Sequence, residues 1–273
     1  MLSNKKLMSA LFLSTAGLFA SAPAIAKNDF TNKLQSYYQS SQELQSQVLQ
    51  AVFVATMTLQ KEPNVPAVKK QGEALPGALE KFEDNFSDLA KLMDKQSIKA
   101  QYSSVIEKVY DEDVTASIPK LEAFSKAYTE FADSMQSETF TVYAKEGWAN
   151  SGITVNKGDL IWVKSEGSWK ASSHYAPTNS EGYVCRSDAY TLNRNAPLGA
   201  LLYRVRGSSS VNGRALQQEN RGQADASGRL EFIMNDEDRR NNLGQLRLQV
   251  VVMDSDDIKE LASRIQGMQD KDS

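Results

Sequence analysis

The sequence contains only one cysteine, Cys185, and one histidine, His174. A single cysteine excludes an internal disulfide, so stability must come from packed cores or a bound ion, and we expect Cys185 to be a small buried hydrophobe rather than an intermolecular thiol. One cysteine and one histidine also disfavour zinc, which those two side chains usually hold. A Ser-His-Asp or Cys-His arrangement would need His174, which we expect to be an ordinary loop residue.

Long apolar runs are also missing. The N-terminal run at 7–20 has about 14 residues, fewer than the roughly 20 that cross a bilayer. Lys5 and Lys6 precede this run, and the segment 21–26 that follows ends in Ala24-Ile25-Ala26. This is the pattern of a secretory signal peptide, residues 1–26, cut after Ala26. We therefore expect a periplasmic or secreted protein with no transmembrane segment in the mature chain.

Arginine is absent until Arg186, and ten arginines then occur up to Arg247. Every basic residue between 27 and 136 is lysine, within a composition rich in Gln and Ala, whereas Gly, Asn and aromatics become common afterwards. Two segments of different surface chemistry predict two domains, at 27–136 and 137–253, followed by a C-terminal helix and tail at 254–273. The net charge of −3 does not indicate a nucleic-acid partner.

The first segment has the hydrophobic period of helices, with a gap around Ser41 and Gln45, and Pro63 and Pro66 are expected to end its first helix. Four amphipathic helices with short loops predict an up-and-down bundle. We expect its aromatic stripes to be core rather than a ligand groove, and this half resembles no family. It could bind a protein partner or assemble the chain. The four apolar stripes are Phe30, Leu34, Tyr38, Val48, Val52, Ala55 and Leu59; Leu79, Phe82, Phe86, Leu89 and Met93; Ile98, Tyr102, Val105, Ile106 and Val109; and Leu121, Phe124, Tyr128, Phe131 and Met135.

The second segment changes to short β-prone runs separated by turn residues, which is typical of an antiparallel β-sandwich. Acidic residues at Asp254, Asp256 and Asp257 then begin a short amphipathic helix. The predicted fold class is α+β, with a helical bundle, a sandwich and a C-terminal helix. Trp162 should lie in the core, and Trp148 beside Gly147 should be the most exposed tryptophan. The strand candidates are 140–144, 153–155, 159–164, 201–205, 230–233 and 246–252.

An ordered set of motifs in this segment resembles the calcium-dependent galactophilic lectins of the PA-IL (LecA) type. It comprises Ile153-Thr154-Val155 with Lys157-Gly158-Asp159, Gly167-Ser168-Trp169, Leu198-Gly199-Ala200-Leu201, Phe232-Ile233-Met234-Asn235-Asp236 and Asn241-Asn242-Leu243-Gly244. The resemblance spans about 138–253 and implies a small β-sandwich. It also implies a calcium ion, held in an end loop, that coordinates sugar hydroxyls directly.

The resemblance implies side-chain calcium ligands at Asp236, Asn241 and Asn242, and a main-chain carbonyl at Tyr175. A further carbonyl would come from near Asp238 or Arg239. Calcium takes six to eight oxygens from carboxylates, amides and carbonyls, and the loop 235–242 is rich in these groups. The family's histidine and glutamine contacts to galactose have no counterpart between 181 and 195, so the sugar is not carried over.

Arg239 and Arg240 bring positive charge to the same loop. At about 5 Å and an effective dielectric constant near 20, each would oppose a divalent ion by several kcal/mol if it pointed inward. The two guanidinium groups must therefore turn outward, or one of them has replaced the metal. A polar hairpin with solvated charges is the alternative interpretation of this loop.

Two functions follow. The first is an exported carbohydrate-binding protein with a calcium-dependent glycan site; the second is an interaction protein whose sandwich has lost sugar binding. An enzyme is not expected, because a glycosidase needs two carboxylates about 5–10 Å apart across a cleft, and Glu237 and Asp238 are adjacent on one loop.

Overall fold

The computed structural model describes residues 29–109, 112–184, 190–216 and 220–268. The predicted signal peptide and Cys185 lie outside these residues. Within them, no helix combines the length and apolarity needed to cross a membrane. The described residues form two compact units: those in 29–60, 66–133 and 259–268 make the first, and those in 61–65 and 134–258 make the second.

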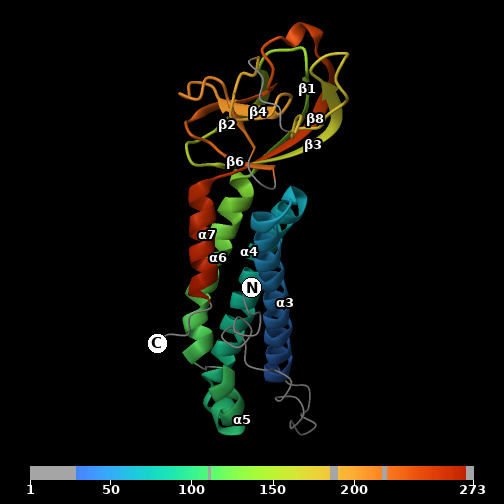
Figure 1. Ribbon diagram of the computed structural model, residues 1–273. Coiled ribbons are helices and arrows are strands. Elements are labelled where there is room, and N and C mark those ends of the chain that lie inside the picture. The colour runs from blue at the N-terminus through green and yellow to red at the C-terminus, as the bar shows by residue number, and fades with distance from the viewer. Residues whose placement is uncertain (1–28, 110–111, 185–189, 217–219, 269–273) are drawn as a thin grey trace. The chain divides into compact units, whose positions relative to one another are not determined.

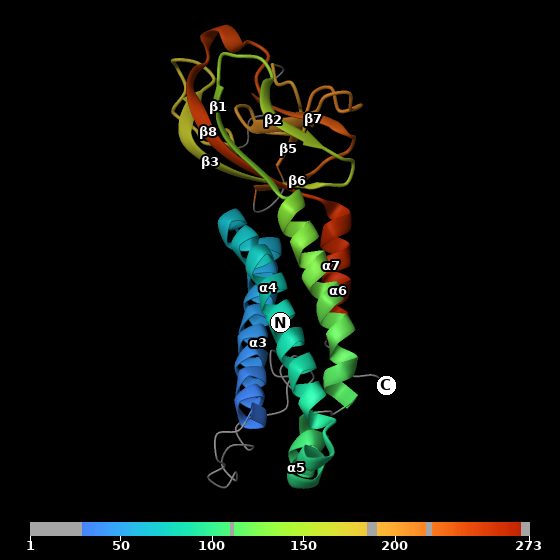
Figure 2. The ribbon, with the colours of Figure 1, turned by 180° about the vertical axis from the view of Figure 1, so that it is seen from behind.

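The first unit is helical. Its elements are α3 (Asp29–Gln60), α4 (Val65–Met93), α5 (Gln96–Val109), α6 (Glu112–Ser134) and most of α7 (Ser255–Gly267). Figures 1 and 2 show α3 beside α4 and α6 beside α7. The α5 segment is short and interrupted at Tyr102, where φ is −127° and ψ is 28°. Most of the C-terminal helix α7 belongs to this helical unit, and its Leu261 and Ile265 are buried. The prediction of a helical N-terminal segment is confirmed.

The stripe from Leu121 to Met135 is buried as predicted, with all five members at most 3% exposed. The stripe of α3 differs from the prediction, because Tyr37, Leu44 and Ala51 are fully packed while Leu34 is only half-buried. Serines fill the apparent gap: Ser40 is buried and its hydroxyl donates to the Tyr37 carbonyl at 2.9 Å. A small hydroxyl satisfied within its own helix can occupy a core position.

The junction between α3 and α4 corrects the expected role of one proline. The first helix ends at Gln60, before Pro63 as predicted, but Pro66 lies in the first turn of α4. Proline is accepted in a first turn, because the backbone N–H there has no helical partner.

The second unit is all-antiparallel β. Its strands are β1 (Gln136–Tyr143), β2 (Ala149–Val155), β3 (Leu160–Lys170), β4 (Leu201–Val205), β5 (Arg214–Ala215), β6 (Arg221–Gln223), β7 (Gly228–Met234) and β8 (Leu243–Met253). They form one sheet in the order β1-β8-β3-β6 and another in the order β2-β7-β4-β5. Each predicted run lies on or overlaps one of these strands.

Side chains from both sheets share one core, in which Val163 and Leu248 of the first sheet join Phe232 and Leu201 of the second. This arrangement is a β-sandwich, and it confirms the predicted fold class. A smaller cluster of Ala196, Ala200, Leu202 and Ile233 lies apart from that core. The segment before β4 therefore covers the other face of the β7-β4 pair, because neighbouring residues of a strand point to opposite faces.

Candidate functional site

The loop between β7 and β8 is held in place by Asn235, which is fully buried. Its Oδ1 accepts from the Asn193 backbone N at 2.9 Å, and its Nδ2 lies within 3.0 Å of the carbonyl oxygens of Asn193, Ala196 and Pro197. One amide thus fixes the end of β7 against the 193–197 segment. Asn235 belongs to one of the motifs that resemble the lectin family, but the sequence assigned no role to it. Its position as a polar residue directly after an apolar strand was the signal that could have identified it.

Asp236 follows at the end of β7 and is 4% exposed. Its Oδ1 accepts from the Asp238 backbone N at 3.0 Å. Burial raises the pKa of Asp236 to about 6, although the Asp238 N–H and the nearby Asn242 amide both act to lower it. A carboxylate withdrawn from water is costly to keep ionised, and either a proton or a bound cation offsets that cost.

Asn242 lies next to Asp236 and is 3% exposed. Its Nδ2 donates to the Ala144 carbonyl at 3.1 Å and contacts Met234 Sδ at 3.4 Å. This arrangement orients the amide, and its Oδ1 is buried without a hydrogen-bond partner among the described residues. A buried oxygen that accepts nothing is rare and calls for an explanation. Asp236 and Asn242, two of the predicted ligands, are thus brought together.

Tyr175 packs against Tyr183, and Tyr183 lies close to Asp236. The two rings pack with their centroids 5.0 Å apart. Tyr183 Oη donates to the Ala176 carbonyl at 2.8 Å and accepts from the Ala171 N–H at 3.2 Å. Burial raises the pKa of Tyr183, and the negative charge of Asp236 adds to this rise. The loop that contains Tyr175 therefore packs around Tyr183, which lies close to Asp236. The sequence did not predict a role for Tyr183.

The other predicted ligands are placed differently. Asp238 pairs with Arg240, whose Nε lies 3.0 Å from Oδ1, and this ion pair lowers the pKa of Asp238. Asn241 ends the short 3₁₀ helix Arg239–Asn241 with its side chain exposed. The Arg240 side chain is 92% exposed, so it turns outward. Arg239 is half-buried, and its charge slightly lowers the pKa of Asp236.

The donor atoms around Asp236 are oxygens, which calcium accepts as ligands. Within the described residues, no group of three or more His, Cys, Asp or Glu side chains could hold a metal ion. A cation here would rely on the Asp236 carboxylate, on main-chain carbonyls and on the Asn242 oxygen, which has no partner among the described residues. Calcium accepts such mixed oxygen donors, whereas zinc prefers nitrogen and sulfur.

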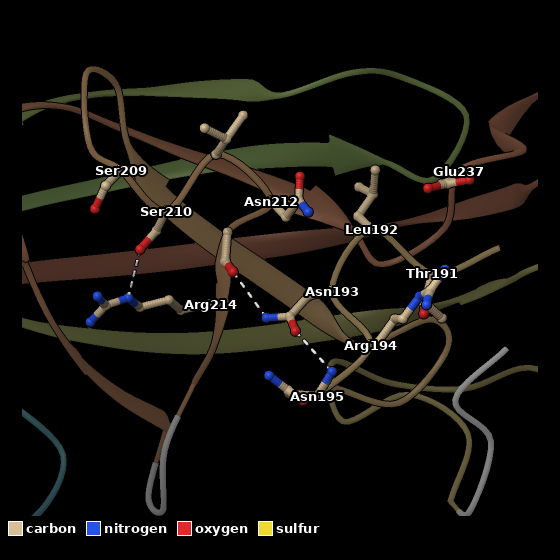
Figure 3. Close-up of a pocket in the computed structure, with 12 residues that line it drawn as sticks. Thr191, Leu192, Asn193, Arg194, Asn195, Ser209, Ser210, Asn212, Arg214 and Glu237 are labelled. Carbon is tan, nitrogen blue, oxygen red and sulfur yellow. Dashed lines mark hydrogen bonds between the residues drawn. The ribbon is translucent and has the colours of Figure 1, made fainter. Parts of the chain in front are cut away.

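A polar groove of about 700 Å³ lies beside this loop. One wall is the segment 191–195, the other is the hairpin 209–214 between β4 and β5, and Glu237 closes one end (Figure 3). Asn193 Nδ2 joins the walls by donating to the Gly213 carbonyl at 3.0 Å, and Asn193 Oδ1 accepts from the Asn195 backbone N at 2.9 Å. Sequence reasoning did not identify this groove, because its walls are distant in the chain.

The tryptophans follow the predicted order of exposure. Trp162 and Trp169 are buried, and Trp169 Nε1 donates to the Gly199 carbonyl at 2.8 Å. Trp148 is half-buried under the Arg204 guanidinium, 4.1 Å from the ring centroid. Arg204 in turn pairs with Glu231 at 2.9 Å. Its cation covers one face of the Trp148 ring. His174 is exposed in a loop, as expected.

No family model and no curated protein matches the chain. Among solved structures, it is similar to the N-terminal domain of EclA, described as a PllA-like lectin, at 20% identity and a TM-score of 0.34. That neighbour is a lectin domain. The match covers 44% of this chain and 98% of that domain.

Proposed function

We propose that the β-sandwich unit binds carbohydrate through a calcium ion held at Asp236 and Asn242. The observation that carries the proposal is a buried carboxylate, Asp236, beside Asn242, whose buried amide oxygen has no hydrogen-bond partner among the described residues. A divalent cation that contacted both oxygens would satisfy both groups. Main-chain oxygens of the neighbouring 175–176 loop would complete the shell, and the remaining positions would accept vicinal sugar hydroxyls.

The charges of the loop are compatible with this site. Arg240 is held away from it by Asp238, which removes one of the two cations that sequence analysis identified as an obstacle. Asp238 then contributes its N–H to orient Asp236 rather than its carboxylate to the ion. The exposed amide of Asn241 is free to reach either the ion or a sugar hydroxyl.

In this proposal the protein acts outside the cytoplasm, where extracellular modules bind calcium at about 10⁻⁴–10⁻³ M. The helical unit would assemble several sandwiches or dock them on a protein partner. Multiplying weak sites in this way raises avidity without new contacts.

A thermal melt with calcium and with chelator tests the ion directly. Calcium at about 100 times its dissociation constant stabilises the folded state by roughly 2.7 kcal/mol, so the melting temperature should rise by several degrees. Asn242→Leu keeps the branched side-chain shape and removes the amide oxygen together with the Nδ2 donor, so this variant should lose the calcium shift, whereas Arg247→Ala at an exposed position of β8 should keep it. Magnesium serves as the ion control, because it demands a tighter octahedral shell.

A glycan array with and without chelator tests the sugar. Calcium-dependent binding supports the proposal. Equal melts in calcium and chelator, together with an array that stays blank, would exclude the proposal and favour a protein-interaction role for the sandwich.

A further inference from the structure

The groove between 191–195 and 209–214 and the candidate calcium site both involve the residues that directly follow β7. Asn235 fixes one groove wall, Asp236 forms the calcium site, and Glu237 lines the groove. Consecutive Cα atoms are about 3.8 Å apart, so the groove lining begins one residue after the candidate calcium ligand Asp236. Glu237 is itself anchored, because its backbone N donates to the Tyr190 carbonyl at 2.7 Å.

The groove walls are built before any ligand arrives. Ser208 and Ser210 donate to Asp225 Oδ2 at 2.6 and 2.8 Å, and Arg214 Nη2 lies 3.0 Å from the same oxygen. Arg214 Nε also donates to Ser210 Oγ at 3.0 Å, the bond drawn in Figure 3. The hairpin is thus fixed from behind, and binding would require little ordering of its backbone.

The groups left over on the groove surface suit a hydroxyl-rich ligand. The side chains of Arg194, Asn195 and Asn212 are exposed and make no hydrogen bond within the described residues (Figure 3). An amide both donates and accepts, and a guanidinium offers five donors, so together they match the alternating needs of vicinal hydroxyls. Val211, 66% exposed, adds apolar surface of the kind that the C–H face of a sugar ring can cover.

The charge balance argues against a polyanion. Arg214 is neutralised by Asp225, which leaves the Arg194 cation and the Glu237 carboxylate as the unpaired charges of the described lining. A phosphate polymer would meet no net positive field here, whereas nucleic-acid sites are strongly positive. A volume of about 700 Å³ lies within the usual range for small-molecule sites.

We propose that this groove binds the inner residues of the same glycan whose terminal sugar is held at Asp236 and Asn242. The protein thereby recognises an oligosaccharide rather than a single sugar. This inference rests on the proposed function and adds a length preference to it.

The test uses the full chain in calcium buffer on an array that presents each common hexose and hexosamine alone and as the terminus of di-, tri- and tetrasaccharides. The variant is Arg194→Ala with Asn212→Ala, and Arg247→Ala is the matched exposed control. We expect the double variant to lose about tenfold in affinity for tri- and tetrasaccharides, the effect of losing one or two hydrogen bonds, and to bind monosaccharides unchanged. Its melting temperature should equal that of the wild type, because neither side chain makes a contact that folding requires.

Each other result has a distinct meaning. Oligosaccharide affinity that is unchanged in the double variant, or that equals monosaccharide affinity in the wild type, overturns the groove while leaving the calcium site. Oligosaccharide binding that survives Asp236→Asn but falls in the double variant overturns the calcium site and supports the groove. A wild-type protein that binds no member of the array overturns both.

Discussion

Asn235 and Asn193 form a reciprocal pair, in which the side chain of Asn235 accepts from the backbone N of Asn193 and donates to its carbonyl, at 2.9 and 3.0 Å. This relationship joins the two segments that matter most. Asn235 leads into the candidate calcium site, and Asn193 forms a wall of the groove. A single buried amide therefore sets the geometry of both.

Replacing Asn235 by alanine should lower the free energy of unfolding by about 2–4 kcal/mol, because buried carbonyl and N–H groups lose their partner. Urea unfolding in calcium-free buffer measures the change. Asn241→Ala is the matched control in the same loop, and its exposed side chain should contribute less than about 0.5 kcal/mol. Equal effects at the two positions would show that Asn235 does not hold the loop.

Asp236→Asn should stabilise the calcium-free protein at pH 7. Burial raises the pKa of Asp236 to about 6, from an ordinary value of 3.8. A carboxyl with a raised folded-state pKa contributes less stability as the pH rises from about 4 to 6, because the folded state then binds more protons than the unfolded chain. The neutral amide should therefore gain about 1–2 kcal/mol at pH 7 and nothing below pH 4.

The same variant should lose any stabilisation by calcium. Urea unfolding at pH 7 and pH 4, with and without calcium, separates the two effects. A variant that is less stable than wild type in calcium-free buffer at pH 7 would contradict the account of Asp236 as an uncompensated buried charge.

Two glycines of α4 should respond oppositely to alanine. A Cβ on Gly72 would lie 2.9 Å from Ala132 Cβ of α6, whereas one on Gly77 would meet nothing within 4 Å. Alanine favours a helix over glycine by about 1 kcal/mol, but overpacking costs about 1–3 kcal/mol. Gly77→Ala should thus raise the melting temperature and Gly72→Ala should lower it. A stabilised Gly72→Ala would show that α4 and α6 do not approach closely there.

Asp225→Asn should weaken the sandwich in a pH-dependent manner. Burial alone would raise the pKa of Asp225, but hydrogen bonds from Ser208 and Ser210 and the charge of Arg214 outweigh it, and the pKa falls below 3.8. A depressed carboxyl pKa contributes stability above the unfolded value, and this stability is lost as the pH falls through the folded value.

The expected loss at pH 7 is about 1–2 kcal/mol, shrinking toward zero below pH 3. Denaturant titrations at several pH values measure it, with the exposed Glu138→Gln as control. A pH-independent loss would mean that Asp225 acts through packing rather than charge.

The sequence by itself determined the types of secondary-structure element and their order along the chain. Periodicity identified the stripe from Leu121 to Met135, and alternation with turn residues identified the strands, because burial of one face imposes a period on the chain. It also pointed to Asp236 and Asn242, through a local motif. The helix α7 was predicted, but its membership of the helical unit was not. An amphipathic pattern shows that one face of a helix is buried, but not which other element packs against that face.

Tertiary structure alone decided the rest. Only folding reveals that Asn242 Oδ1 lacks a partner in the described part of the chain, that Arg240 turns toward Asp238, and that 191–195 faces 209–214 across a groove. These facts depend on which distant groups meet and which are withdrawn from water. Local patterns record the face a residue occupies but not the atoms opposite it, and electrostatic cost and ligand chemistry are set by those atoms.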